Sequence, residues 1–239
     1  MALKLFCSMR LDKYISNSTA LSRKEAMKVI KSGKIQVEGQ VCRNPAQKID
    51  PLGAIFLDGR PVIYRENIYL MLNKPEDYIC STRDGRNKTV LELLPEDFAS
   101  REPFACGRLD IDTTGLVLLT DDGKWSHNIT SPKKKCFKTY LIKSLYSLSE
   151  ESMKKLEDGV FLDGDDKVTL PAKVQEVGDS EYELQIQEGR FHQVKRMFVS
   201  VGNRVLKLHR SSIGNIELDE NLQLGQWREL TEDEVGLFK

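Results

Sequence analysis

Residues 107–115, Gly-Arg-Leu-Asp-Ile-Asp-Thr-Thr-Gly, form the stretch of the sequence best suited to chemistry. The stretch is polar and lies between two apolar segments that read as strands, so it can present a carboxylate at the end of a sheet. Asp110 and Asp112 are the candidate acids. A polar turn in which Asp and Thr side chains bond to their own backbone explains the pattern equally well. The residues therefore indicate a candidate carboxylate site and leave its role open.

Other enzyme chemistries lack their usual sequence signals. There is no Walker loop, no G-x-G-x-x-G and no H-E-x-x-H, and the three histidines have no metal-site spacing. Residues 112–115, Asp-Thr-Thr-Gly, are similar to the Asp-Thr-Gly of aspartic proteases, but the extra Thr breaks the tripeptide and no second copy exists. A retaining glycosidase needs two carboxylates about 5 Å apart on opposite sides of a sugar. Asp110 and Asp112 are too close in sequence to assume that arrangement.

The composition is that of a globular protein with room for one small and one large domain. The chain has 239 residues, of which 40% are apolar and 30% charged. No apolar run has the length of a membrane span, and residues 1–10 lack the apolar core of a signal peptide. The five cysteines are widely spaced without a C-x-x-C pair, which indicates reduced thiols and no zinc site. We expect a cytoplasmic protein.

The net charge of zero hides an uneven distribution of charge. Residues 1–50 hold ten Lys and Arg and only four acids, which leaves 26 basic and 32 acidic residues in the rest. A second run, residues 189–212, holds six basic residues and no acid. Two basic segments on a neutral protein indicate one extended polyanionic ligand.

The basic N-terminal segment predicts two helices and a hairpin. Ser22 and Glu25 form a capping box that opens the second helix, and Gly33 closes it. A hairpin is expected from strands at 35–37 and 41–43. One face of the second helix carries a lysine stripe, which a solvated helix surface also explains: Lys24, Lys28 and Lys31.

The rest of the chain predicts longer elements. Polar residues from 58 to 67 indicate a linker, with domains at 9–60 and 68–239 on either side of residues 61–67. Strands are expected at 68–73, 116–120, 138–144 and 182–186, and helices at 89–94, 124–130, 149–157 and 192–201. The fold class is α+β: a small N-terminal α/β domain, then a domain with a mixed, mainly antiparallel sheet.

Three segments resemble, in order, the signature segments of the pseudouridine synthase superfamily. They are G-R-L-D-I-D-T-T-G-L at 107–116, K-T-Y-L at 138–141 and E-G-R-F-H-Q-V-K-R-M-F at 188–198. S-R-K-E-A at 22–26 and G-K-I-Q-V-E-G at 33–39 resemble the S4 RNA-binding module, and M-L-N-K-P at 71–75 resembles the branch that modifies ribosomal RNA. T-D-D-G-K-W-S-H at 120–127 resembles its small-subunit members. Members begin near M-R-L-D, here residues 9–12, so residues 1–8 would be an extension or a misassigned start.

The resemblance implies isomerisation of uridine to pseudouridine in small-subunit (16S) ribosomal RNA, without metal or cofactor. Uracil leaves its ribose, rotates and rejoins through C5. Asp110 would be the essential carboxylate, acting as a nucleophile or as a base, and Lys195 would supply the cation that keeps it ionised in a partly dry pocket. Tyr140 would stack on the extruded uracil, and Arg108 would hold the flipped nucleotide's place or grip its phosphate.

The resemblance also implies further contacts and partners. Residues expected to shape the segment around Lys195 or to contact RNA are Arg190, His192, Gln193, Arg23, Lys24, Lys28 and Lys31. The protein is expected to act on RNA as a monomer, without membrane partners. The alternative is a non-catalytic S4-type RNA-binding protein. Asp110, Tyr140 and Lys195 in motif order favour the isomerase, because a binding module needs no such trio.

Overall fold

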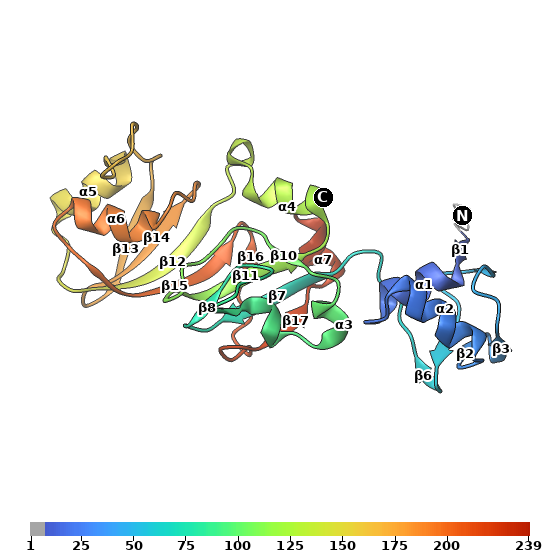
Figure 1. The fold of residues 1–239 in the computed structure, drawn as a ribbon. Helices are drawn as coiled ribbons and strands as arrows, with labels where there is room; N and C mark the ends of the chain where they lie inside the picture. The colour runs from blue at the N-terminus through green and yellow to red at the C-terminus, as the bar shows by residue number, and fades with distance from the viewer. Residues whose placement is uncertain (1–7) are drawn as a thin grey trace. The chain divides into compact units, whose positions relative to one another are not determined.

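A computed structural model of the chain describes residues 8–239, which divide into two compact units (Figure 1). The first unit comprises the residues up to Ile68 together with Leu94–Glu102, and the second comprises Tyr69–Leu93 and Pro103–Lys239. Most of the predicted N-terminal extension, residues 1–7, lies outside the described residues. Within residues 8–239, no helix combines the length and the apolar character needed to cross a membrane.

The first unit packs two helices on a small antiparallel sheet. Helix α1 (Leu11–Ser18) and helix α2 (Arg23–Lys31) bury Tyr14, Ile15 and Ile30 in a common core. The predicted capping box of Ser22 and Glu25 is confirmed at the start of α2. The sheet order is β3-β2-β5-β6, and β1 pairs with β4. The strands are β1 (Met9–Arg10), β2 (Ile35–Val37), β3 (Gln40–Cys42), β4 (Lys48–Ile49), β5 (Ile55–Leu57) and β6 (Arg60–Pro61).

Two tight turns organise this sheet. Glu38 and Gly39 both have positive φ and join β2 to β3, which confirms the predicted hairpin. Asp58 and Gly59 also both have positive φ and join β5 to β6. This geometry is the two-residue hairpin turn for which an acid followed by Gly is typical. The residues that the sequence analysis places at the start of a linker therefore form a second hairpin.

A segment from later in the chain completes the first unit. Helix α3 (Glu96–Ala99) lies in the stretch that clusters with it. Arg101 donates hydrogen bonds to the carbonyl oxygens of Asn17, Arg65 and Glu66 at 2.7–2.8 Å. The chain thus returns to the first unit after it has begun the second.

The second unit is built on a nine-stranded, mainly antiparallel sheet in the described part of the chain. The main order is β13-β14-β12-β15-β11-β7-β17, with β10 on β11, β16 on β15, and a parallel pair only between β11 and β15. A separate short pair joins β8 to β9. The strands are β7 (Tyr69–Lys74), β8 (Tyr78–Ile79), β9 (Lys88–Thr89), β10 (Phe104–Ala105), β11 (Thr114–Thr120), β12 (Lys138–Ser144), β13 (Lys173–Gly178), β14 (Glu181–Ile186), β15 (Val205–Ile213), β16 (Ile216–Glu217) and β17 (Trp227–Glu229).

Helices cover parts of this sheet. They are α4 (Gly123–Thr130), α5 (Glu150–Asp158), α6 (Gln193–Ser200) and α7 (Glu232–Gly236), with short 3₁₀ turns η1 (Val90–Leu93) and η2 (Pro132–Lys134). Three of the four helices expected here are confirmed, while that at 89–94 is only the short turn η1. Phe198 of α6 contacts Tyr182 of β14, with ring centroids 6.2 Å apart, so α6 covers the face of the sheet to which Tyr182 points.

Candidate active site

The polar loop 107–115 leads directly into strand β11. Gly115 has φ +105°, and a Cβ atom there would lie 2.3 Å from the backbone oxygen of Arg210. Only glycine allows β11 and β15 to approach each other so closely. This close parallel contact fixes the end of the loop that carries Asp110 and Asp112 to the centre of the sheet.

Lys74 binds the backbone of the polar loop 107–115, a role that the sequence analysis missed. Its side chain is fully buried at the end of β7, and Nζ donates to the carbonyl oxygens of Pro75, Ile111 and Thr113 at 3.0, 3.2 and 2.8 Å. Burial lowers the pKa of this ammonium, and the acids nearby only partly offset that effect. The available signal was the Lys-Pro pair that ends the apolar strand in M-L-N-K-P.

Asp110, Asp112 and His192 meet around the ammonium of Lys195. Nζ lies 3.1 Å from Asp110 Oδ2 and 2.5 Å from Asp112 Oδ1, and His192 Nε2 lies 3.6 Å from Asp110 Oδ1. Burial tends to lower the pKa of Lys195, but its hydrogen bonds to Asp112 and Asp110 raise it overall. Burial tends to raise the pKa of Asp112, yet the bond to Lys195 and its charge hold that pKa below the usual value. The arrangement keeps a cation beside two carboxylates.

The segment that carries Lys195 is clamped by a neighbouring loop. Asp165 pairs with Arg190 at 3.0 Å and with Arg196 at 2.7 Å. Arg190 also donates to Glu188 and to two backbone carbonyls, and Gln193 bonds to Glu188 and to the backbone of Arg190. Arg190 and Gln193 therefore make their hydrogen bonds within the chain and shape the start of α6.

These contacts reduce the basic surface that the run of residues 189–212 indicated. Arg190 and Arg196 face Asp165, and Arg210 is buried with Nε bonded to the carbonyl of Leu116. Arg204 and Lys207 remain exposed. Counting charges along the sequence could not reveal these ion pairs, because Asp165 lies outside the basic run and reaches Arg190 and Arg196 only in the folded chain.

Tyr140 lies on the face of the sheet that α6 covers. It is aligned in the strand register with Leu184 of β14 and Arg210 of β15, and Arg210 is aligned with Gly115. Paired residues point to the same face, and Leu184 shares its face with Tyr182, which contacts α6. Tyr140 is only 8% exposed, so this residue is largely buried.

The remaining predicted contacts are on the surface. Arg108 is exposed and makes no ion pair among the described residues. In the first unit the side chains of Lys24, Lys28 and Lys31 are exposed, while Arg23 lies 3.4 Å from the buried Asp12.

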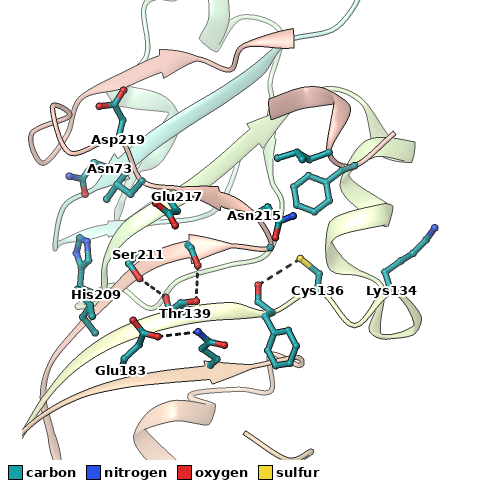
Figure 2. Close-up of a pocket in the computed structure, with 18 of the residues that line it drawn as sticks. Asn73, Lys134, Cys136, Thr139, Glu183, His209, Ser211, Asn215, Glu217 and Asp219 are labelled. Atoms are coloured by element: carbon teal, nitrogen blue, oxygen red, sulfur yellow. Dashed lines mark hydrogen bonds between the residues drawn. The ribbon is translucent and has the colours of Figure 1, made fainter. Parts of the chain in front are cut away.

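A groove of about 1080 Å³ lies on the opposite face of the sheet (Figure 2). Thr139, Glu183 and His209 line it, and they alternate along their strands with residues of the Tyr140 face. Lys134 and Lys135 also line this groove, and Asp110 and Lys195 do not. The groove is thus a different surface from the carboxylate cluster. Across residues 8–239, no three metal-ligating side chains gather as a metal site requires.

Comparison with known proteins identifies the family. The model of the family described as RNA pseudouridylate synthase matches residues 68–200. The chain belongs to the RNA pseudouridylate synthase family. An S4 domain model matches residues 9–55, within the first unit.

Relatives in the RNA pseudouridylate synthase family cover nearly the whole chain. Proteins named ribosomal small subunit pseudouridine synthase A from Salmonella typhimurium, Vibrio parahaemolyticus and Escherichia coli K12 are 46%, 47% and 45% identical over 229 residues. Each match spans 95% of this chain and 98–99% of the relative. A crystal structure of a pseudouridylate synthase is 40% identical with a TM-score of 0.69, and the match covers 96% of this chain and 99% of that one. The predicted family, fold class and isomerase activity are confirmed.

Proposed function

We propose that this isomerase converts a specific uridine of small-subunit ribosomal RNA to pseudouridine, with Asp110 as its essential carboxylate. The N1–C1′ bond of the uridine breaks, the C5–C1′ bond forms, C5 loses its proton, and N1 takes up a proton in place of the ribose. The relatives named for the small ribosomal subunit support the substrate. The protein works in the cytoplasm as a monomer, without metal or cofactor.

The observation that carries the proposal is the ion pair between Lys195 and Asp110 at 3.1 Å. The Asp110 side chain is 27% exposed, so water screens it only in part and a ligand can still reach it. The ion pair places this carboxylate beside a cation, where it can act either as a nucleophile or as a base. Tyr140, on the α6 face of the sheet, stacks on the extruded uracil, and Arg108 occupies the flipped nucleotide's place or binds its phosphate.

The first unit supplies RNA affinity in this proposal. Its exposed lysines, Lys24, Lys28 and Lys31, and the partly paired Arg23 bind phosphate groups, which position RNA without reading its sequence. Binding of the RNA backbone also offsets the free energy of a few kcal/mol that it costs to remove a uridine from its stack.

The test is to map pseudouridines in ribosomal RNA from cells with and without this protein. We expect one small-subunit position to remain uridine in the deletion strain and to be restored by the wild-type gene, but not by a gene encoding Asp110→Asn. Purified wild-type protein should release tritium from C5-labelled uridine in small-subunit RNA. An unchanged map together with RNA binding would favour the non-catalytic S4-type protein instead.

A further inference from the structure

An exposed aromatic ring lies beside the carboxylate cluster. Phe191 leaves 72% of its surface in solvent and stacks on His192, with ring centroids 3.8 Å apart and ring planes inclined by 19°. The imidazole Nε2 of His192 lies 3.6 Å from Asp110 Oδ1. The two rings thus form a short stack that starts at Asp110 and ends in solvent.

The backbone around this stack is held in place. The carbonyl oxygen of Phe191 accepts a hydrogen bond from Arg196 Nη1 at 3.1 Å, and Asp165 holds Arg196 in turn. His192 has φ +48°, a left-handed conformation that persists in a non-glycine residue only when its surroundings impose it. The ring pair is therefore organised before a ligand binds, which reduces the entropy lost on binding.

A phenyl ring in this position is suited to stacking on RNA bases. An apolar ring gains free energy when its surface leaves water, so a ring fixed in solvent beside an active site is a candidate ligand contact. Aromatic side chains stack on any base of a single strand, because every base has a π face. The exposed guanidinium of Arg108, on the same loop as Asp110, adds attraction for the RNA backbone.

We propose that Phe191 stacks on the nucleobase next to the target uridine, so that Phe191 and His192 form a base-binding subsite. The proposal rests on the proposed function, because it takes RNA as the substrate. When the uridine leaves the helix, its neighbour loses a stacking partner. Phe191 replaces that partner and stabilises the flipped state.

The test compares wild type, Phe191→Ala and Phe191→Tyr on a small-subunit RNA fragment that the wild type modifies. We expect Phe191→Ala to bind about ten-fold or more weakly, the size of one lost base stack. The slope of affinity against salt should not change, because no phosphate contact is lost. Phe191→Tyr, which keeps the ring, should restore binding and tritium release.

The same RNA is then made with an abasic nucleotide on one side or the other of the target uridine. At one of these positions, the abasic nucleotide should weaken binding by the wild type as much as the Phe191→Ala substitution does. The same abasic RNA should bind to Phe191→Ala no more weakly than the intact RNA does. Tyr146→Ala is the control, because Tyr146 is another exposed aromatic residue, 63% exposed, in the turn after β12. Its binding should equal that of wild type.

Equal binding by wild type and Phe191→Ala, or additive losses with both abasic RNAs, would overturn the stacking proposal. A wild-type protein that releases no tritium from any ribosomal RNA would instead overturn the proposed function.

Discussion

At the scale of single residues, Lys195 joins two carboxylates that differ in their exposure. The Asp112 side chain is 64% exposed and the Asp110 side chain only 27%, although the shorter bond goes to Asp112. Water screens an exposed ion pair, so the bond to Asp112 contributes little free energy even though it is the shorter of the two. We infer that Asp112 helps to orient the ammonium, while Asp110 is the carboxylate that reacts.

Substitution of the two acids by Asn separates these roles. Asp110→Asn should reduce turnover by at least about a thousand-fold, because it removes the nucleophile or base while its shape is kept. RNA binding should survive in this variant. Asp112→Asn should stay within about ten-fold of wild type, since Lys195 keeps its bond to Asp110. Tritium release measures turnover and a binding titration measures RNA affinity for each variant. If Asp112→Asn loses turnover and Asp110→Asn keeps it, Asp112 is the reacting acid.

Lys74→Met should destabilise the second unit. The substitution removes the Lys74 donor from the carbonyl oxygen of Thr113, and leaving a buried acceptor without a donor costs about 1–3 kcal/mol. The carbonyl oxygen of Ile111 keeps its hydrogen bond from the backbone N–H of Asp77. Both tryptophans, Trp125 and Trp227, lie in the second unit, so tryptophan fluorescence during urea unfolding follows that unit. Turnover should also fall, because the loop shifts. Lys143→Met, which removes a half-exposed lysine from the same sheet, is the control and should change the unfolding free energy little.

Single residues of the site were predictable only where a motif carried them. Asp110 stands out by its polar, glycine-bounded loop, but its pairing with Lys195 came from family resemblance, because no local pattern links residues so far apart. Lys74 was missed since a lysine after an apolar strand usually lies at the surface, whereas here three carbonyl groups solvate it inside the protein. Arg210 was counted as a surface charge, but it is buried within β15 and its Nε donates to the carbonyl oxygen of Leu116.

At the scale of elements, the placement of α6 depends on the loop that contains Asp165. This carboxylate bridges Arg190, before the helix, and Arg196, within it. Arg196 also bonds to the carbonyls of Phe191 and Asp163. Asp165 is thus a positioning residue for Lys195 and touches none of the proposed catalytic residues itself.

Asp165→Asn should loosen the start of α6 and lower turnover by about ten- to a hundred-fold, because small displacements of catalytic groups are costly. Hydrogen exchange of the amides at the start of α6 should become faster. Asp158→Asn, which removes an exposed acid paired within α5, is the control and should alter neither quantity. Slower turnover with unchanged exchange in α6 would mean that Asp165 acts by another route.

Elements with local signals were the ones that sequence predicted best. Strand β12 matches its expected range because its side chains alternate, and α2 begins at the capping box as expected. The long strand β15 was missed because Lys207, His209 and Arg210 read as part of a charge cluster, although they lie within a strand pattern. Its parallel contact with β11 depends on Gly115 and Arg210 meeting across the sheet, which no local pattern encodes.

At the scale of the whole molecule, the proposed function assigns RNA affinity to the first unit and chemistry to the second. The first unit carries the exposed lysines of α2, and the second carries the carboxylate cluster on its own sheet. If the first unit mainly binds phosphates, its contribution should appear as ionic-strength dependence rather than in the rate of the chemical step.

Replacement of Lys28 and Lys31 by Gln tests this division in the full chain. Each lost phosphate contact should make the slope of log affinity against log salt shallower by about 0.7–0.9, so the double variant should bind more weakly at low salt and approach wild type at high salt. Turnover at saturating RNA should stay near the wild-type value, because the cluster around Lys195 is untouched. The matched control replaces Lys154 and Lys155 by Gln, which removes the same charge from exposed lysines already paired with acids of their own helix, α5. Equal slopes for wild type and the α2 variant, or a shallower slope only in the α5 control, would assign the RNA contacts to a surface other than α2.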